Sequence, residues 1–385
     1  MTAFTKAEIE ARGHPVWAEV DLGAIRSNVS TLRALAHGAE VMGVVKGYAY
    51  GHGNPASARA MLEAGATRLG VARVAEALHL REAGIEAPIH VFTEPPPAAA
   101  GAIVDNDLTA TLYTKDFARS LADAATASGR RVPVHVKLDT GMHRVGVVAD
   151  DVADAIAYLK GLEAIDIEGA WSHLAVADVV DHPFTRKQLD LFLDLTGKIE
   201  RAGVDVRYRH LANSAAAISM PETHFDIVRC GVASYGLYPG DDFDRLVSLR
   251  PALSLKARVN MVKIVPPGDA LSYGLTYRVD SHRRVVTIPA GYADGYDRRL
   301  SGDADVLVRG RRYRVSGTVC MDQFMVDVGN DEAEVGDIVT LIGGDGAERV
   351  TAEELARHIG TINYEVTSRI PSRVPRLYLN ESTDA

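Results

Sequence analysis

The chain has 385 residues, 47% hydrophobic and 24% charged, a composition typical of a globular protein with about two domains. Its formal net charge of -9, without a run of basic residues, disfavours a nucleic-acid or anionic-membrane partner. No apolar run approaches the roughly 20 residues that span a bilayer, so we expect no membrane segment. The two cysteines are too few for a disulfide framework and fit a reducing cytoplasm. The 13 histidines show no metal-ligand spacing, which disfavours a metal site.

Residues 1–13 are charged and polar, without the apolar core of a secretory signal, and we expect a flexible tail there. Short apolar runs, each predicted to be a strand, then alternate with amphipathic stretches predicted to be helices. The expected strands are 41–46, 68–72, 88–92, 108–113, 133–138, 165–171, 208–212 and 227–230. The expected helices are 24–36, 55–64, 74–82, 116–128, 150–162 and 184–201, with shorter candidates at 98–105 and 214–220.

Eight strand-then-helix units predict an α/β fold, a (β/α)8 barrel of the TIM type over residues 14–246. An open doubly wound sheet is the alternative, which counting units does not exclude. Unusual polar residues follow the strands repeatedly, at the end of such a barrel where active sites lie. These residues are Lys46, Lys137, Arg144, His173, Asn213, Ser214, Arg229 and Gly231.

Lys46 ends the first of these strands. Desolvation lowers the pKa of an amine and makes it a nucleophile for carbonyl groups; the alternative is a solvated loop lysine. Barrels of this type often bind phosphate in the loops after the last two strands, where Ser214, Gly231 and Val232 lie. The alternative is that Ser214 is an ordinary N-cap and Gly231 a turn residue.

After Pro251 the sequence consists mainly of β-branched runs separated by Gly and Asp, and we expect a mainly β C-terminal domain over 247–385. Its predicted strands are 253–265, 284–289, 306–315, 324–328 and 337–342. A helix is predicted over 351–359, starting at a capping box formed by Thr351 and Glu354, and the rest is expected to be extended to residue 378. Several tyrosines fall in expected loops of this domain.

The segment VVKGYAYGHG around Lys46 resembles the pyridoxal phosphate (PLP) attachment site of bacterial alanine racemases, which usually have Ala-Asn in place of Gly47-Tyr48. VKLDTGMHRVG, around Arg144, resembles another segment of that family, which more often has glycine at the position of His143. Further segments match in order: HLANSAA, VRCGVASYGLYPG, SYGLTY, GYADGYDR, CMDQ and NYEV. The resemblance runs from about residue 14 to residue 379.

The resemblance implies PLP-dependent racemisation of alanine, supplying D-alanine for peptidoglycan. Lys46 would hold PLP and act as the base for the D-enantiomer, with Tyr273 as the base for the L-enantiomer. A tyrosine with a pKa near 10 needs nearby cations to act near neutrality, and His173 and Arg229 are the candidates. Arg229 would face the pyridine nitrogen. The other implied PLP-binding residues are Tyr50, His173, Asn213, Ser214, Gly231, Val232 and Tyr364.

The same match implies that Arg144, Met321 and Tyr273 bind the substrate, with Lys137, Tyr292, Cys320 and Asp322 in support. Lys137 aligns with a lysine that is often carbamylated in the family, giving an anion that braces Arg144; the alternative is an ammonium paired with Asp139. In the family the counterparts of Tyr273 and Met321 act on the neighbouring subunit's PLP, which implies a homodimer.

Three other functions stay open. The chain could racemise serine or a broader set of amino acids. It could be a decarboxylase of basic amino acids, although it has no Gly-Gly-Gly run. It could also be a PLP-binding barrel without catalysis, although such proteins lack a β domain.

Overall fold

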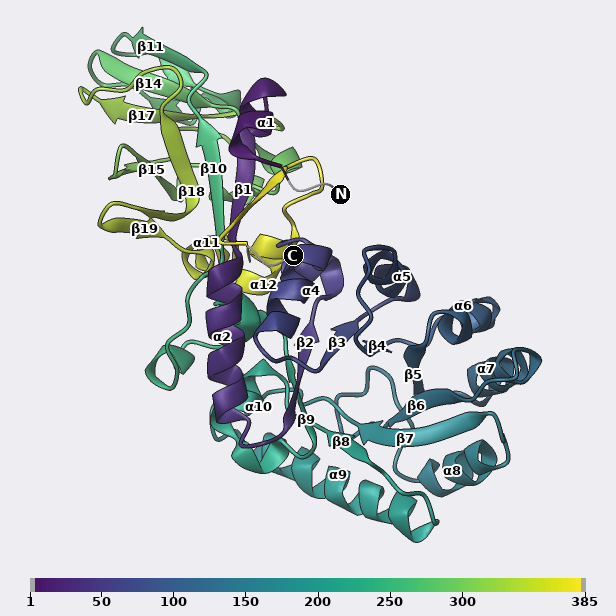
Figure 1. Cartoon of the computed structure of the whole chain (residues 1–385). Coiled ribbons are helices and arrows are strands. Elements are labelled where there is room, and N and C mark those ends of the chain that lie inside the picture. Colours follow the sequence, from purple (N-terminus) through teal and green to yellow (C-terminus); the bar gives the residue numbers. More distant parts are fainter. Residues whose placement is uncertain (1–3, 382–385) are drawn as a thin grey trace. The chain divides into compact units, whose positions relative to one another are not determined.

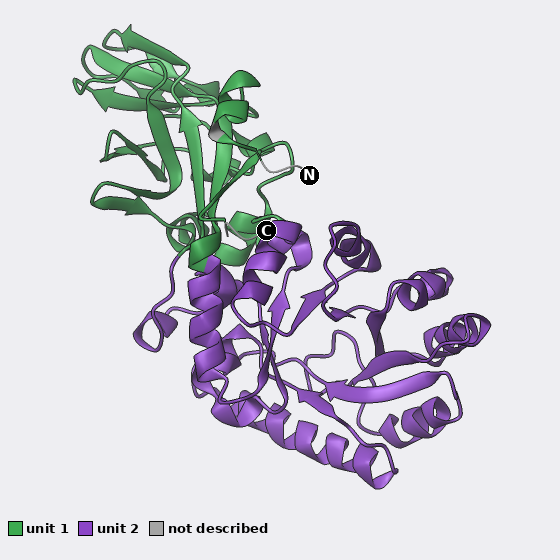
Figure 2. Cartoon of the chain, in the orientation of Figure 1, with its two compact units in different colours: residues 1–24, 50–53, 251–385 green, residues 25–49, 54–250 purple. Residues whose placement is uncertain are grey.

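The computed structural model describes residues 4–381 and divides the chain into two compact units (Figure 2). Unit 1 contains residues up to 24, residues 50–53 and residues from 251 onward, and unit 2 contains residues 25–49 and 54–250. These boundaries differ from the expected domains 14–246 and 247–385, because residues 14–24 belong with the C-terminal part of the chain. In the described residues no helix is both long and apolar enough to cross a membrane.

Unit 2 is built around an eight-stranded parallel sheet in the order β8-β7-β6-β5-β4-β3-β2-β9. Its strands are β2 (Glu40–Val44), β3 (Arg68–Val71), β4 (Ile89–Val91), β5 (Leu108–Leu112), β6 (Val132–Lys137), β7 (Ile165–Trp171), β8 (Tyr208–His210) and β9 (Ile227–Cys230). Backbone hydrogen bonds from Asp226 to Arg209 and from Arg229 to Ala212 join the two end strands. Because β9 pairs with β2 on one side and these bonds join it to β8 on the other, the strands form a nearly closed ring. The predicted barrel is therefore confirmed, and the open doubly wound sheet is excluded.

Helices cover the outside of this sheet (Figure 1). They are α4 (Asn54–Glu63), α5 (Val74–Glu82), α6 (Ala100–Asp105), α7 (Lys115–Ala127), α8 (Val152–Lys160), α9 (Pro183–Arg201) and α10 (Ser214–Ser219), and α2 (Leu22–Leu35) precedes β2. The sequence of α7 shows why such a segment forms a helix that packs against the sheet. Thr114 caps its N-terminus by accepting a hydrogen bond from the Phe117 amide, and Phe117, Leu121 and Ala125 are buried at intervals of four residues.

Unit 1 contains two main sheets. The larger has the path β16-β15-β18-β10-β1-β20, with β19 paired to β18, and the smaller has the order β11-β14-β17. Their strands are β1 (Val16–Asp21), β10 (Leu253–Arg258), β11 (Met261–Val265), β14 (Arg283–Ile288), β15 (Asp305–Val308), β16 (Arg311–Arg314), β17 (Phe324–Gly329), β18 (Ile338–Asp345), β19 (Glu348–Val350) and β20 (Arg376–Leu379). A hairpin of β12 (Ala270–Leu271) and β13 (Tyr277–Arg278) completes the unit.

The position of β1 explains the domain boundary. It pairs with β10 on one side and with β20 on the other, so the first strand of the chain completes the C-terminal sheet. The predicted strand 253–265 is in fact two strands, β10 and β11, which belong to different sheets. The apolar pattern gives the strand conformation but does not say which sheet a strand joins.

Two local predictions in unit 1 are wrong. The expected flexible tail contains a helix, α1 (Lys6–Ala11), which starts with a capping box between Thr5 and Glu8; residues 1–3 lie outside the described part. The segment expected to be extended up to residue 378 contains α12 (Asn363–Ser368). Its residues Val366 and Thr367 are β-branched, which is typical of strands. Here both side chains are buried, and this packing outweighs the local preference for a strand.

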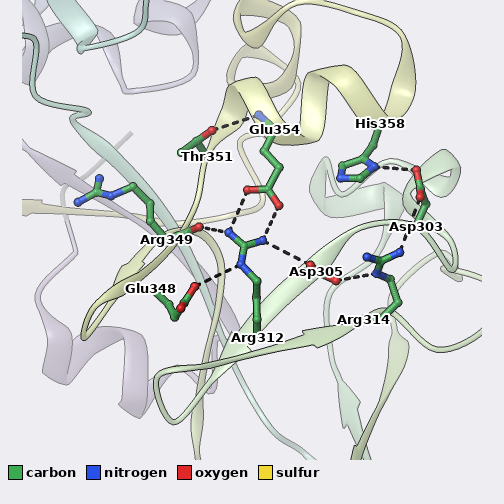
Figure 3. A network of polar contacts seen from close by, with 9 residues as sticks. All are labelled: Asp303, Asp305, Arg312, Arg314, Glu348, Arg349, Thr351, Glu354 and His358. Carbon is green, nitrogen blue, oxygen red and sulfur yellow. Dashed lines mark hydrogen bonds and ion pairs between the residues drawn. The ribbon is translucent and has the colours of Figure 1, made fainter. Parts of the chain in front are cut away.

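Helix α11 (Ala352–Ile359) starts at Thr351 as predicted, and the Thr351 hydroxyl accepts a hydrogen bond from the Glu354 amide at 3.1 Å. The Glu354 carboxylate, however, binds the guanidinium of Arg312 on β16, with 3.1 Å between Nη2 and Oε2 (Figure 3). Only half of the expected capping box therefore forms. Arg312 also contacts Asp305 and Glu348, and so links the β15–β16 hairpin to α11 and β19 (Figure 3).

Candidate active site at the carboxyl ends of the barrel strands

Lys46 follows β2 and opens a tight left-handed turn. Residues 47–50 all have φ between 53° and 62°, a region that costs roughly 1–2 kcal/mol for a residue with a Cβ atom. Gly47 takes up this conformation without that cost, and a Cβ atom added there would meet no atom within 4 Å. The structure thus gives a physical reason for glycine at position 47.

The amine of Lys46 lies in an electropositive, half-buried place. Burial lowers its pKa from the usual value, and the positive charges of Arg144 and Arg229 act in the same direction, against the carboxylate of Glu76. Glu76 also accepts a hydrogen bond from the Gly47 amide at 2.6 Å, which ties the turn to α5. A lysine with a lowered pKa is more often the neutral amine, the form that attacks carbonyl groups and accepts protons.

Arg229 on β9 is a buried cation held by backbone carbonyls. Its guanidinium donates to the carbonyl oxygens of Ser172, His210 and Leu211 at 2.8, 2.9 and 3.1 Å, and its nitrogens lie 3.2 Å from Nδ1 of His173 and of His210. Burial lowers its pKa to about 9, so it keeps its charge at neutral pH. Among residues 4–381 no acceptor is recorded for its Nε, which leaves one donor for a ligand.

The charge of His173 differs from the expectation. Its pKa lies well below the usual value, first because of burial and then because of the Arg229 charge. The imidazole is therefore neutral, and its Nδ1 accepts a hydrogen bond from Arg229. The prediction that His173 supplies a positive charge is wrong, because the sequence does not reveal how deeply this side chain is buried beside another cation.

Lys137, at the end of β6, is also buried. Its Nζ donates to the Leu138 carbonyl at 2.7 Å, and burial followed by the Arg229 charge lowers its pKa to about 7. The alternative pairing with Asp139 is not seen in the described residues. The Asp139 carboxylate instead accepts hydrogen bonds from the amides of Gly141 and His143 and shapes the loop after β6. Lys137 is therefore a buried amine without a direct carboxylate partner in that range.

The expected phosphate loops come together through the hydroxyl of Ser214. It accepts hydrogen bonds from the amides of Gly231 and Ala233 at 2.9 and 3.4 Å, which joins the loops after β8 and β9. The N-cap of α10 is Asn213, whose side chain accepts from the Ala216 amide, so the alternative role of Ser214 as the cap is wrong. Val232 opens the 3-10 helix η3 (Val232–Tyr235) directly behind Gly231.

These residues fit an anionic ligand with a phosphate group and a carbonyl carbon. The Ser214 hydroxyl and the backbone of Gly231 and Val232 lie together where the loops after β8 and β9 meet, while Arg229 and the exposed Arg144 supply positive charge. The amine of Lys46, whose pKa is lowered by burial, is the nucleophile available for a carbonyl. PLP has these features, and the chemistry of the side chains matches it.

The remaining predicted residues lie in unit 1. Tyr273 opens the 3-10 helix η5 (Tyr273–Leu275) and is 70% exposed, and Met321 is 54% exposed. The Thr318 hydroxyl donates to the Tyr273 carbonyl at 2.8 Å, and the Tyr292 amide donates to the Cys320 carbonyl at 3.2 Å.

Asp322 accepts a 2.7 Å hydrogen bond from Arg373. The structure thus brings Tyr273, Tyr292 and the segment 320–322 into one group of loops. Tyr50 and Tyr364 form a separate pair, with ring centroids 6.1 Å apart.

One group of polar residues was missed by the sequence analysis. His90, His135 and His210 are buried in the barrel, and their ring nitrogens lie within 4.8 Å of one another. Linear spacing did not reveal them because they come from three different strands. A histidine inside each of three predicted barrel strands is the signal that could have found them.

Comparison with known proteins finds the same family in both the N-terminal and the C-terminal part of the chain. The chain matches the family model "Alanine racemase, N-terminal domain" over residues 20–239 and "Alanine racemase, C-terminal domain" over residues 252–378. It is 45% identical to an alanine racemase of Desulfovibrio desulfuricans, over 95% of this chain and 98% of the relative. It is 44% identical to an alanine racemase of Desulforamulus reducens, over 95% and 99%.

Solved structures agree as well. The alanine racemase of a D-cycloserine-producing Streptomyces lavendulae matches with a TM-score of 0.89 and 42% identity, over 95% of this chain and 97% of that one. The alanine racemase of Bacillus anthracis with bound L-Ala-P matches with a TM-score of 0.91 and 39% identity, over 96% and 97%.

Proposed function

Because the chain belongs to the alanine racemase family, we propose that it interconverts L- and D-alanine with PLP bound through Lys46. The observation that carries this proposal is the position of Lys46, a lysine with a lowered pKa on the same barrel rim as Arg229 and Ser214. When bound, PLP stabilises the carbanion that forms when an amino acid loses its α-proton.

The residues of this chain hold PLP in a defined way. The Ser214 hydroxyl and the amides of Gly231 and Val232 bind its phosphate, together with Tyr50 and Tyr364. His173 and Asn213 belong to the same PLP-binding set. Arg229 would face the pyridine nitrogen of bound PLP and, because a guanidinium gives up its proton with difficulty, would keep that nitrogen unprotonated.

Two bases serve the two faces of the substrate α-carbon. The amine of Lys46 takes and returns the proton of D-alanine, and the phenol of Tyr273 does so for L-alanine. Tyr273 comes from the partner in a homodimer, and its 70% exposure on its own chain supports this role. Arg144 and the backbone amide of Met321 bind the substrate carboxylate, and Tyr292, Cys320 and Asp322 support this group.

Lys137 is carbamylated in the active enzyme and braces Arg144. A pKa of about 7 supports this proposal, because much of the amine is then neutral at physiological pH and can attack carbon dioxide. The D-alanine produced supplies peptidoglycan synthesis in the cytoplasm.

The test combines spectroscopy with an assay. The purified protein with PLP should show a visible absorbance band, and borohydride should fix PLP onto the peptide that contains Lys46. It should also exchange the α-hydrogen of alanine with deuterium from solvent. A variant Lys46→Ala should lose both properties.

Other outcomes favour the alternatives. Faster turnover of serine than of alanine, in a panel of L-amino acids, would replace the alanine assignment. A yellow protein that cannot exchange the α-hydrogen would instead be a PLP-binding barrel without catalysis.

A further inference from the structure

A continuous row of hydrogen bonds runs through the barrel core from Arg229 to Glu168. Nη1 of Arg229 lies 3.2 Å from Nδ1 of His210, and Nε2 of His210 lies 2.7 Å from Nδ1 of His135. Nε2 of His135 lies 3.1 Å from the carboxylate of Glu168. The row thus joins strands β9, β8, β6 and β7, from the candidate PLP site to the other side of the barrel core.

The two ends of the row fix the position of every proton in it. A guanidinium can only donate, so Nδ1 of His210 is an acceptor, and a neutral His210 must carry its proton on Nε2. That proton points at Nδ1 of His135, which therefore accepts it, and His135 carries its own proton on Nε2. A carboxylate can only accept, so Glu168 completes the row without conflict.

The surroundings keep both imidazoles neutral. Burial lowers the pKa of His135 and moves that of His210 well below its usual value. The indole of Trp171 stacks on the ring of His210, with an interplanar angle of 4° and 5.6 Å between centroids. At the far end, burial acts to raise the pKa of Glu168, but the bond from His135 and the Arg207 charge bring it below its usual value, so Glu168 is ionised.

The backbone is shaped to make the contact between His135 and Glu168. The pairing of β6 with β7 shifts here: Val134 lies opposite Ile167, and His135 lies opposite Gly169, so Glu168 is the extra residue of a β-bulge. Bulges redirect a side chain at sites where regular pairing would not. A Cβ atom on Gly169 would lie 2.6 Å from the His135 ring, so glycine makes the space that this ring occupies.

We propose that His210, His135 and Glu168 form a proton-ordered relay that positions Arg229, with Glu168 as the carboxylate that balances this buried cation through two neutral imidazoles. No direct ion pair of Arg229 with a carboxylate is recorded in the described residues, and an unbalanced buried charge is costly. His135 and Glu168 are positioning residues, because they act on Arg229 through His210. Glu168 also lines a cavity of about 310 Å³ with Arg68, Asp107 and Tyr208, at the opposite end of the row from Arg229.

The proton positions can be measured without PLP. Long-range ¹H–¹⁵N spectra of the PLP-free protein, labelled at histidine, should show His135 and His210 at pH 7 as neutral rings protonated on Nε2. In Glu168→Leu, Arg229 still holds both tautomers, but the Nε2–H of His135 loses its acceptor, so its proton resonance should move upfield. Glu168→Gln should restore the position of that resonance, because the amide oxygen accepts the proton. A proton on Nδ1 of His210, or a charged His135, in the unmodified protein would overturn the relay.

Asp166 offers a matched control on the same strand. Arg207 contacts both carboxylates at 3.0 Å, but only Glu168 reaches His135. Asp166→Asn should therefore leave both tautomers and the Nε2–H resonance of His135 unchanged. If Glu168→Leu does not fold, the spectra of the unmodified protein and of Glu168→Gln still test the relay. A changed His135 tautomer in Glu168→Gln would contradict it.

In the PLP-loaded enzyme the inference rests on the proposed function. Glu168→Leu should lower kcat on the order of tenfold, as loss of a supporting partner commonly does, and shift the visible PLP band, while the KM for alanine stays unchanged. Glu168→Gln should recover most of the rate. Unchanged kcat and absorbance in Glu168→Leu would overturn the positioning role. Ordered tautomers in a protein that binds no PLP would instead overturn the proposed function and leave the relay intact.

Discussion

His143 and Asp139 form an ion-pair geometry across a strained backbone: Nδ1 of His143 lies 3.1 Å from the Asp139 carboxylate, although His143 has a φ of 54°. That backbone region favours glycine, which has no Cβ atom. The imidazole contact offsets part of the strain. A side-chain contact thus helps to hold the loop that carries Arg144, the next residue.

Substitution of His143 separates the two effects. His143→Ala keeps the strain and loses the contact, whereas His143→Gly loses both. We expect His143→Ala to be less stable than His143→Gly by about 1 kcal/mol, the cost of the left-handed region for a residue with a Cβ atom. Urea unfolding of the two variants measures this difference. Equal stability would show that the backbone is not strained here.

Lys137 gives a pH-dependent prediction. Its pKa falls from 10.5 to about 7 on folding, so protonation favours the unfolded chain. The resulting cost to stability is full below pH 7 and disappears as the pH rises towards 10.5. Lys137→Met should therefore stabilise the protein most at pH 6, by up to about 5 kcal/mol, and by progressively less at pH 8 and 9.5. Urea unfolding in bicarbonate-free buffer tests this, and a gain that does not change with pH would contradict it.

The proposed carbamate on Lys137 has a direct signature. With ¹³C-labelled bicarbonate, the native protein should show one slowly exchanging carbamate resonance by ¹³C NMR, because the neutral amine adds carbon dioxide. Lys137→Met is the control and should lack the signal. A spectrum without this resonance in the native protein would leave Lys137 as a plain amine.

Tyr273→Phe tests the second base. The variant should keep PLP bound but lose racemisation in both directions by about 10²–10⁴-fold, the usual contribution of one acid–base group. Exchange of the α-hydrogen of D-alanine with deuterium should continue, because Lys46 serves that face alone. Tyr158→Phe, on the surface helix α8, is the control. A racemisation rate near that of the control would remove Tyr273 from the mechanism.

The ion pairs around Arg312 give a prediction about the stability of unit 1. Arg312 and Glu354 are 31% and 20% exposed, so their ion pair is partly shielded from water. Glu354→Gln leaves the backbone amide that Thr351 caps and should lower the free energy of unfolding by about 1–2 kcal/mol. Glu332→Gln removes a 90% exposed carboxylate 3.8 Å from Arg309 and should change it by less than about 0.5 kcal/mol. Equal effects of the two substitutions would argue against the network.

Most of the fold could be read from local patterns. The eight barrel strands lie where their apolar runs predict, because strand conformation and the turns between strands depend on neighbouring residues. The same holds for the N-cap of α11, Thr351. The helix α1 was missed although its capping box is also local, because a short charged segment at a chain end resembles a frayed tail.

The positions of Lys46, Lys137 and Arg229 could likewise be inferred from the sequence, since Lys46 and Lys137 lie at the ends of predicted strands and Arg229 lies in one. The sequence did not determine which sheet β1 joins, that His173 is neutral, or that Asp139 turns away from Lys137. It also gave no sign that a bulge at Glu168 brings that carboxylate to His135. Hydrogen-bond partners and burial depend on residues far apart in the chain, so only the tertiary structure decided the charges and proton positions on which the chemistry depends.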